Sequence, residues 1–399
     1  MQLLAAQMIV LSRRLVRPGW ILFDEVVREV GDGHPPERVR EAAASVTTLG
    51  EGVLTPGLVD IQVNGAFGVD FAAATDDEFV RVAEQMPSTG VTAFVPTFIT
   101  APVEDMADCL ATYGSLRPRL DAAPGAARTL GIHLEGPFLA ERRRGAHRAD
   151  LLSDPDPALI EDLLTAAGGC LTYMTLAPER AGAIAAIRQL TSAGVRVALG
   201  HTDADAPTVR AAADAGATLV THLYNAQRPM RHRDPGTVGA ALTDPRLTCG
   251  LIVDLHHVAP IAVEIAFRAA AGAIALVTDA VAAMGMPAGS YQLGGDRLEI
   301  APGLPPRRAD GAIAGSALRM DEAIANAVLH CGVDLGAAIN AATQIPASAI
   351  GRNDLGRLAP GAPADLAWLG DDLIARTTWV GGQRAWSRDH EDASAGARR

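Results

Sequence analysis

The chain has 399 residues, which is long enough for one large domain with a smaller companion. Hydrophobic residues make up 49% of it and charged residues 20%, a balance that excludes an intrinsically disordered protein, and the net charge of −12 argues against binding to nucleic acid or to a membrane surface. All 34 basic residues are arginines, so a Schiff-base lysine, a Walker lysine and a carbamylated lysine between two metals are excluded.

The first 56 residues contain short strand-like runs that are separated by turn residues such as Pro18-Gly19 and Pro56-Gly57. Similar short runs return at residues 356–385. We expect 1–56 and 356–385 to pair into one small β-sandwich domain assembled from both ends of the chain. The polar, small residues 386–399 are expected to form a disordered tail.

Between these ends, strand-like and helix-like segments alternate from about residue 59 onward. Helix-like amphipathic stretches such as 76–86 and 207–215 separate most of the strands. The sequence therefore predicts an α/β fold in which residues 57–355 form a TIM-like (β/α)8 barrel. A doubly wound sheet would carry GxGxxG after its first strand, and that motif is absent there. The expected strands are 59–64, 92–98, 128–135, 171–176, 195–201, 218–224, 250–255 and 273–278.

Polar side chains stand at the carboxyl ends of four of these strands. Glu135, His201 and His222 make a His2Glu set, the three-ligand arrangement that leaves a zinc-type ion a fourth position for water. Asp279 closes the last strand and could accept the proton of that water and deliver it to a leaving amine. The alternatives are a solvated strand-end glutamate, histidines satisfied within the core and a structural carboxylate.

Three further histidines are candidates for substrate contacts. His257 ends the seventh expected strand and could hydrogen-bond a substrate carbonyl or oxyanion. Because successive residues of a strand face opposite ways, only one of His256 and His257 should face the pocket. His147 follows the third strand in a loop, and a surface position is equally compatible with its sequence.

A basic cluster, Arg228, Arg231 and Arg233, follows the turn at 224–226. Charge clusters are usually solvated, but arginine matches phosphate oxygens in a bidentate fashion. A basic cluster beside the barrel mouth of an acidic protein therefore suggests an anionic substrate.

Taken together, these stretches resemble the N-acetylglucosamine-6-phosphate deacetylase family of the amidohydrolase superfamily. The most specific similarities are HLEGP at 133–137 and THLYNA at 221–226, whereas the closing segment 356–366 is typical of the whole superfamily. The resemblance extends over about residues 1–385. It implies hydrolysis of N-acetylglucosamine 6-phosphate to glucosamine 6-phosphate and acetate, in amino-sugar catabolism or cell-wall recycling.

The resemblance also implies roles for individual residues. Glu135, His201 and His222 would hold one divalent metal ion per subunit, zinc above all, with iron(II), cobalt or manganese as alternatives. Asp279 would be the catalytic acid and base. Arg233 would hold the 6-phosphate in the neighbouring subunit's site, which implies a homodimer. The residues expected to contact or line the sugar are Ala146, His147, Asn225, Ala226, His257, Ile313, Ala314 and Gly315.

The chain departs from the family pattern at a few positions. Many amidohydrolases carry His-x-His at the end of the first strand, where this chain has Gln62 and Asn64. This favours a single tightly held metal, with Gln62 and Asn64 left to hold water or a weak second site. The family's Asp-Gly-Leu-His is here Asp254-Leu255-His256-His257, and Gln227 replaces a methionine, so the sugar pocket can differ in shape.

Two other functions stay open at this stage. The chain could remove the acyl group from another N-acyl amino sugar or from an N-acyl amino acid, or it could be a catalytically silent scaffold that binds a partner. Four cysteines without a CxxC pair are typical of a reduced, cytoplasmic protein. The amino terminus does not read as a signal peptide, and no apolar run approaches the ~20 residues of a membrane span.

Overall fold

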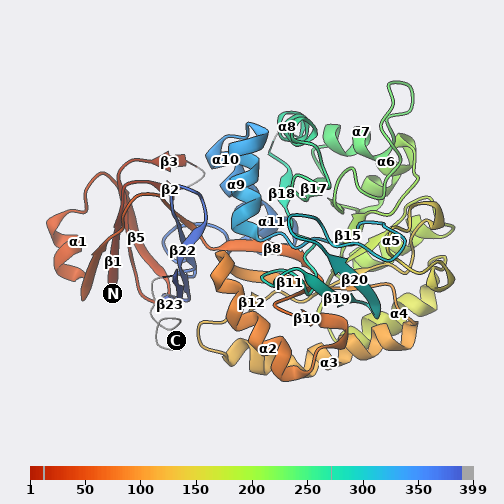
Figure 1. The fold of residues 1–399 in the computed structure, drawn as a ribbon, viewed down its shortest axis with the longest axis horizontal. Coiled ribbons are helices and arrows are strands. Elements are labelled where there is room, and N and C mark those ends of the chain that lie inside the picture. Colours follow the sequence, from red (N-terminus) through yellow and green to blue (C-terminus); the bar gives the residue numbers. More distant parts are fainter. Residues whose placement is uncertain (12–13, 271, 389–399) are drawn as a thin grey trace.

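A computed structural model describes residues 1–11, 14–270 and 272–388. Helices surround a barrel of strands on one side of the molecule, and two sheets built from the two ends of the described chain lie on the other side (Figure 1). No helix in these ranges is long and apolar enough to cross a lipid bilayer.

The barrel strands are parallel and follow one another in chain order, and they number eight in the described part of the chain. The ring closes through a parallel bridge between Val63, at the end of the first barrel strand, and Ala280, just beyond the last. The predicted (β/α)8 barrel is thus confirmed. The barrel strands are β8 (Leu58–Val63), β11 (Val91–Ile99), β13 (Ile132–Glu135), β14 (Leu171–Leu176), β15 (Arg196–Leu199), β16 (Leu219–Val220), β17 (Thr248–Leu251) and β18 (Ile274–Leu276), and β12 (Arg128–Thr129) adds to β11.

Several strands end earlier than the sequence pattern predicts. The prediction carried the fifth strand to His201, the sixth to Tyr224 and the seventh to Leu255, but β15, β16 and β17 end at Leu199, Val220 and Leu251. His201, Tyr224 and Leu255 all have positive φ angles, of 46°, 76° and 65°. A left-handed residue turns the chain out of the ladder, so the polar residues stand on turns just past the strands.

The helices after the first one pack their apolar faces on the outside of the barrel, whereas the first helix buries Val39 against Leu3 and Trp20 in the domain at the chain ends. The second helix, for example, begins with a capping box in which Thr75 and Glu78 satisfy each other's backbone amides, and it buries Phe79 and Val82. The helices are α1 (Glu37–Ala42), α2 (Asp76–Gln85), α3 (Val103–Ala122), α4 (Pro157–Ala167), α5 (Ala183–Ser192), α6 (Ala206–Ala215), α7 (Gly236–Thr243), α8 (Pro260–Ala269), α9 (Met320–Cys331), α10 (Leu335–Ala341) and α11 (Gln344–Ala349).

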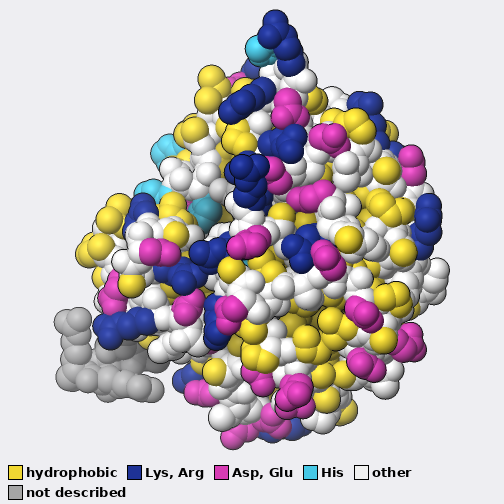
Figure 2. Space-filling view, turned by 90° about the vertical axis from the view of Figure 1, so that its right-hand side faces the viewer, with side chains coloured by type: hydrophobic (Ala, Val, Ile, Leu, Met, Phe, Trp, Pro, Cys, Tyr) yellow, Lys and Arg dark blue, Asp and Glu magenta, His cyan; other side chains and the backbone are white. Residues whose placement is uncertain are grey.

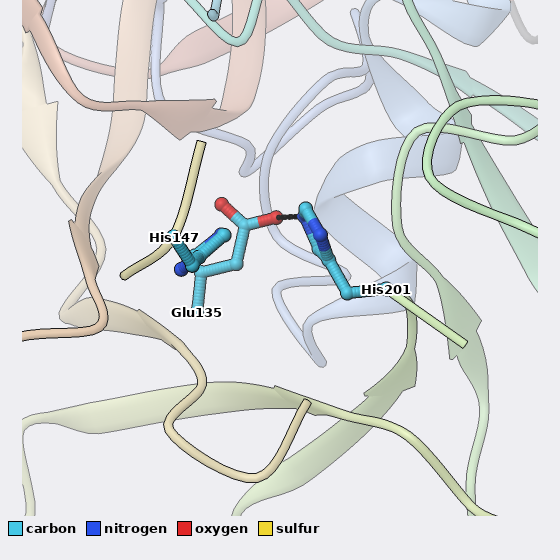
Figure 3. A group of neighbouring side chains, drawn as sticks. All are labelled: Glu135, His147 and His201. Atoms are coloured by element: carbon cyan, nitrogen blue, oxygen red, sulfur yellow. Dashed lines mark hydrogen bonds and ion pairs between the residues drawn. The ribbon is translucent and has the colours of Figure 1, made fainter. Parts of the chain in front are cut away.

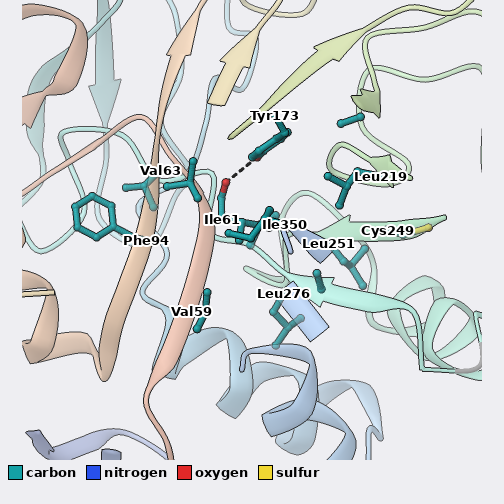
Figure 4. Packing of buried hydrophobic residues seen from close by; sticks show 14 of the residues in the cluster. Val59, Ile61, Val63, Phe94, Tyr173, Leu219, Cys249, Leu251, Leu276 and Ile350 are labelled. Carbon is teal, nitrogen blue, oxygen red and sulfur yellow. Dashed lines mark hydrogen bonds between the residues drawn. The ribbon is translucent and has the colours of Figure 1, made fainter. Parts of the chain in front are cut away.

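The strands of the barrel are buried on both faces, as parallel strands beneath helices must be. Val59, Ile61 and Val63 of β8 belong to the same apolar cluster as Phe94 of β11 (Figure 4). The Tyr173 hydroxyl donates a 2.6 Å hydrogen bond to the carbonyl oxygen of Ile61 inside this core. The interior is therefore packed, and chemistry is left to the ends of the barrel.

Two sheets join the beginning and the end of the chain. One has the strand order β5-β4-β1-β6 and the other β23-β22-β21-β7-β2-β3, and their apolar side chains share a cluster that includes Ile21, Leu54 and Leu366. The strands are β1 (Gln2–Ala6), β2 (Ile9–Leu11), β3 (Arg14–Val16), β4 (Gly19–Phe23), β5 (Val27–Asp32), β6 (Ser45–Thr48), β7 (Val53–Pro56), β21 (Leu366–Leu369), β22 (Ala375–Val380) and β23 (Gln383–Ser387).

The expected tail begins later than predicted. Trp386 and Ser387 lie in β23, where they pair with β22, so disorder from residue 386 was wrong for these two residues. Residues 389–399, the rest of that expected tail, lie outside the described residues.

An unpredicted hairpin follows the last barrel strand. Its two strands pair with each other, and it packs over the mouth of the barrel because Leu293 joins a small apolar cluster with Val281 and Ala314. The backbone amide of Gly294 at its turn donates a 2.7 Å hydrogen bond to Asp70. The hairpin strands are β19 (Gly289–Leu293) and β20 (Asp296–Ile300), and the nearby ribbon is β9 (Gly65–Ala66) and β10 (Val69–Asp70).

Candidate active site

A cavity of about 350 Å³ opens where the carboxyl ends of the barrel strands meet, the end at which such barrels keep their chemistry. A larger cavity of about 700 Å³ is lined by the first residues of β15 and β17, Arg196 and Thr248, and so lies at the opposite end. The smaller cavity is lined by Asn64, Ile99, Glu135, Arg142, Arg143, Gly145, Ala146, His147, His201, His222, Asn225, Ala226, Ile252, His256, His257, Asp279, Leu293, Ile313, Ala314 and Gly315.

Glu135, His201 and His222 converge in this cavity. The Nε2 atoms of both histidines lie 3.0 Å from the same carboxylate oxygen, Glu135 Oε1, and 3.1 Å from each other. Three donor atoms that each lie about 2 Å from one ion stand roughly this far apart. The structure thus brings together the three residues that the sequence suggested as metal ligands.

The hydrogen bonding of His201 shows that this triangle suits a cation. Its Nδ1 lies 2.9 Å from the carbonyl oxygen of Arg143, which can only accept, so Nδ1 carries a proton. Nε2 is then the nitrogen available to a cation, and a cation bound there would also contact Glu135 Oε1, which lies 3.0 Å from this nitrogen.

His222 and Glu135 show a need for positive charge. Burial lowers the pKa of His222, but the hydrogen bond and the charge of Glu135 outweigh it and raise that pKa to about 9. Burial likewise raises the pKa of Glu135, and the two histidines overcome it and hold that pKa well below its usual range. A divalent ion would supply this positive charge with both imidazoles neutral, and the residues present therefore fit a metal ion.

His147 lies beside this triangle. Ligand atoms of Glu135, His147 and His201 all lie within 4.8 Å of one another, and Figure 3 shows the three side chains facing one another. However, Nδ1 of His147 is engaged with Thr100 Oγ1 at 2.9 Å, and burial lowers the pKa of His147 to about 3, so the ring is neutral. The closer spacing of the triangle with His222 makes His222 the better third ligand.

Asp279 lies on the wall of the cavity next to the triangle. Its Oδ1 accepts hydrogen bonds from Asn64 at 2.8 Å and from Gln62 at 3.1 Å. Burial and the charge of Glu135 raise the pKa of Asp279 to about 6, while His222 and Asn64 lower it. A buried carboxyl group with a pKa close to neutrality is suited to accept and return a proton.

Gln62 and Asn64 both hydrogen-bond to Asp279. Both amides donate to Asp279, and Gln62 Nε2 also lies 3.4 Å from Glu135 Oε2. At the positions where many amidohydrolases place two histidine ligands, this chain places donors that stabilise the charged form of the acid.

His256 and His257 both line the cavity, which corrects the expectation that only one of them would. Strand alternation does not apply because β17 ends at Leu251, and Asp254 organises a turn instead. The carboxylate of Asp254 accepts from the backbone amides of both histidines, and its Oδ2 lies 2.6 Å from Nδ1 of His257. This contact fixes the orientation of the His257 ring at the cavity.

The other expected substrate contacts divide into two groups. Ala146, Asn225, Ala226, Ile313, Ala314 and Gly315 all line the cavity. Arg233 does not, because it lies exposed in the segment that projects from the barrel before α7 (Figure 1). Arginine and histidine side chains gather at the protruding tip in Figure 2.

The three arginines of the basic cluster, Arg228, Arg231 and Arg233, lie in different surroundings. Arg228 does not line the cavity, because its guanidinium pairs with Asp234 at 3.1 Å and with Asp203 at 3.5 Å. Arg231 and Arg233 are exposed beyond it. Sequence reasoning did not assign a role to Asp203, or to the lining residues Ile99 and Leu293, since no motif marks them.

Comparison with known proteins agrees with this geometry. The amidohydrolase family model matches residues 53–385. The N-acetylglucosamine-6-phosphate deacetylase of Bos taurus is 37% identical over 393 residues, which cover 94% of each chain. The N-acetylgalactosamine-6-phosphate deacetylase of Escherichia coli O157:H7 is also 37% identical, over 94% of this chain and 97% of its own.

A solved structure has the same fold. A variant of N-acetyl-D-glucosamine-6-phosphate deacetylase from Mycobacterium smegmatis, in complex with N-acetyl-D-glucosamine-6-phosphate, superimposes with a TM-score of 0.89 at 38% identity, over 97% of this chain and 99% of that one. With its barrel, its His2Glu triangle and these relatives, the chain belongs to the amidohydrolase family, among the N-acetylglucosamine-6-phosphate deacetylases.

Proposed function

We propose that this protein hydrolyses N-acetylglucosamine 6-phosphate to glucosamine 6-phosphate and acetate, in amino-sugar catabolism or cell-wall recycling. The observation that carries the proposal is the triangle of Glu135, His201 and His222 with Asp279 beside it in one cavity. The relatives named above support the choice of substrate.

The proposed cofactor is one divalent ion per subunit, held by Glu135, His201 and His222. We propose zinc, because a His2Glu set is a catalytic zinc arrangement, while iron(II), cobalt and manganese suit the same donors. When bound, the ion supplies Lewis acidity, which polarises an amide carbonyl and acidifies water.

The reaction then depends on proton transfers by the protein. Asp279 Oδ1, held by Asn64 and Gln62, accepts the proton of the attacking water and delivers it to the amide nitrogen as the carbon–nitrogen bond breaks. His257 is oriented by the contact between its Nδ1 and Asp254, and Nε2 donates to the carbonyl oxygen on which negative charge develops when the ring carries protons on both nitrogens.

Replacement of the acid tests this mechanism. Asp279→Asn should retain the metal, measured by elemental analysis, while kcat falls by about 10²–10⁴-fold because the proton carrier is gone. Asp205→Asn is the matched control, since Asp205 only caps α6 and asparagine caps equally well, so its kcat should stay within twofold. Near-normal turnover by Asp279→Asn would remove Asp279 from its role.

Arg233 is proposed to bind the 6-phosphate of the substrate in the neighbouring subunit of a homodimer. Its exposure on the projecting segment, away from its own cavity, supports this arrangement. Arg233→Ala should raise the KM for the phosphorylated sugar by about 10- to 100-fold with a smaller effect on kcat, since a charge-assisted contact contributes roughly 1.5–3 kcal/mol.

Arg231→Ala is the control for that variant, because Arg231 is also exposed on the same segment. An unchanged KM for Arg233→Ala would favour the second candidate, another N-acyl amino sugar or an N-acyl amino acid. Acetate release across phosphorylated and free N-acetyl hexosamines separates these substrates directly. Protein purified without added metal and found to contain none would favour a silent scaffold.

We place the enzyme in the cytoplasm. Among the described residues all four cysteines, Cys109, Cys170, Cys249 and Cys331, are free thiols, which supports a reducing compartment.

A further inference from the structure

A single carboxylate, that of Asp203, joins the two loops that frame the candidate site. We infer that Asp203 is a positioning residue, which fixes the metal-ligand orientation of His201 through Arg143 and anchors the segment carrying Arg233 through Arg228. The inference rests on the metal site of the proposed function and adds a residue that touches neither metal nor substrate.

The first connection runs from Asp203 to Arg143. The Oδ1 atom of Asp203 accepts from Arg143 Nε at 2.8 Å and lies 2.7 Å from its Nη2, a fork that fixes the guanidinium. The Asp203 and Arg143 side chains are only 17% and 28% exposed, so solvent screens this pair less than a surface ion pair.

The backbone of the same arginine reaches the metal site. The carbonyl oxygen of Arg143 accepts from Nδ1 of His201 at 2.9 Å, which holds the ring in the tautomer whose Nε2 faces Glu135. Arg143 lies in a short 3-10 turn, Glu141–Arg143, outside any sheet. No strand pairing therefore fixes the position of this carbonyl group, and the ion pair between Arg143 and Asp203 helps to fix it instead.

Asp203 is itself held in place. Its backbone amide and the Thr202 hydroxyl both donate to the carboxylate of Glu179, and the Thr202 amide donates to the Ala226 carbonyl oxygen at 3.1 Å. A fixed anchor is a requirement for a positioning role.

The second connection runs from Asp203 to the projecting segment. Oδ2 of Asp203 lies 3.5 Å from Nη2 of Arg228, and Nη1 of Arg228 lies 3.1 Å from Asp234. The backbones of Arg231 and Asp234 hydrogen-bond to each other across the turn that carries Arg233. Arg228 thus ties the base of this turn to the loop beside His201.

Charge attraction supplies the side-chain part of both connections, beside the backbone hydrogen bonds from Ala140 to His201 and from Arg228 to Thr202. Arg143 and Arg228 meet at this one carboxylate, and the exposed Arg142 adds a weaker contact at 3.5 Å. Without Asp203 the guanidiniums would repel one another and both loops would lose their common partner.

The first experiment measures zinc affinity by competition with a chromophoric chelator, starting from the zinc-loaded full-length enzyme. Asp203→Ala should weaken zinc binding by about 10- to 100-fold, as loss of an outer-shell partner does, and Asp203→Asn, which keeps an acceptor oxygen, by less. Asp214→Ala is the control, because Asp214 pairs with Arg246 on the surface and should leave the affinity unchanged.

Single and double variants then separate the two connections. Arg143→Ala should weaken zinc binding, whereas Arg228→Ala should raise KM and leave zinc affinity unchanged. Asp203→Ala combined with Arg143→Ala should bind zinc no more weakly than Asp203→Ala alone, since both act through one contact. The absorption spectrum of the cobalt-substituted enzyme should change in Asp203→Ala and not in Arg228→Ala.

Zinc affinity within twofold of the wild type in both Asp203→Ala and Arg143→Ala overturns the inference while leaving the proposed function intact. If Asp203→Ala does not purify as a folded protein, Asp203→Asn and Arg143→Ala test the same contact. Failure of the wild type itself to bind zinc or another divalent ion contradicts the proposed function instead.

Discussion

His201, His222 and Asp279 share a backbone conformation that residues with side chains seldom adopt, with φ angles of 46°, 28° and 49°. Such left-handed residues cost about 1–3 kcal/mol each and persist only where the surrounding structure holds them. Each one lies two or three residues beyond the end of a barrel strand. The turn directs each side chain over the end of the barrel, and all three side chains line the same cavity.

The amides around Asp279 give a prediction at this scale. Asn64 Nδ2 donates to the carboxylate at 2.8 Å and so favours its charged form. The proposed mechanism needs the deprotonated carboxylate, so activity should fall as pH drops through its pKa, and Asn64→Ala should raise that pKa. The acidic limb of the kcat profile should therefore move up by about one pH unit, since one unit is roughly 1.4 kcal/mol.

The control for Asn64→Ala is Asn353→Ala, an exposed position whose profile should match the wild type. An acidic limb that stays in place or moves to lower pH in Asn64→Ala shows that the amide does not act on the proton carrier.

At the scale of elements, the end of β13 depends on a glycine. Gly136 has φ +94°, and a Cβ there would stand 2.1 Å from Thr100 Oγ1. Thr100 in turn donates to the carbonyl oxygen of Glu135 at 3.1 Å and contacts Nδ1 of His147 at 2.9 Å. The strand end that presents Glu135 can therefore approach β11 only because residue 136 has no side chain.

Gly136→Ala should lower the free energy of unfolding by at least about 2 kcal/mol, from backbone strain and the clash with Thr100, and should lower activity by displacing Glu135. Gly168→Ala is the matched control, since Gly168 also has positive φ but meets nothing within 4 Å, and should cost about 1 kcal/mol with full activity. Chemical denaturation and acetate release measure both. Equal changes in the free energy of unfolding for the two variants would show that backbone strain, and not the clash with Thr100, accounts for the effect of Gly136→Ala.

At the scale of the whole molecule, a polar chain crosses the barrel interior. His133 Nδ1 lies 3.1 Å from Thr97 Oγ1, His133 Nε2 lies 2.7 Å from Thr175 Oγ1, and Thr175 Oγ1 lies 2.7 Å from Thr221 Oγ1. His133 is fully buried, stacks on Tyr173 and has a pKa lowered by burial to about 3. These hydroxyl and imidazole groups, which are neutral at physiological pH, link β11, β13 and β14 to the residue that follows β16.

This buried histidine makes stability depend on pH. Its folded pKa of about 3 lies below the ordinary 6.5, so only the unfolded chain takes up its proton as pH falls between these values. The free energy of unfolding should drop by roughly 1.4 kcal/mol per pH unit from this group. Urea denaturation at pH 6 and pH 4 should show a smaller decrease in the free energy of unfolding for His133→Gln than for the wild type.

His34→Gln, at an exposed position, should keep the wild-type pH dependence. If His133→Gln also keeps the wild-type pH dependence of stability, the ring of His133 is protonated in the folded protein, contrary to its burial.

Much of this molecule could be predicted from local pattern. Apolar runs alternating with amphipathic stretches gave the barrel, because a strand buried between helices must be apolar throughout. Glu135, His201 and His222 were recognisable as candidate metal ligands because each stands where such a run stops. The hairpin of β19 and β20 was missed, since its alternating and partly exposed strands leave a weak pattern after the last barrel strand.

The sequence by itself determined the (β/α)8 barrel and the types of the candidate ligand residues, since both follow from residue identity and spacing along the chain. Only the tertiary structure decided which side chains share a contact. It directed Gln62 and Asn64 to Asp279, brought both His256 and His257 to the cavity, and joined Asp203 to Arg143 and Arg228. These contacts depend on turns and on charged residues from segments that are distant in the sequence. The packing of the whole barrel sets the relative positions of these segments, so no local sequence pattern predicts the contacts.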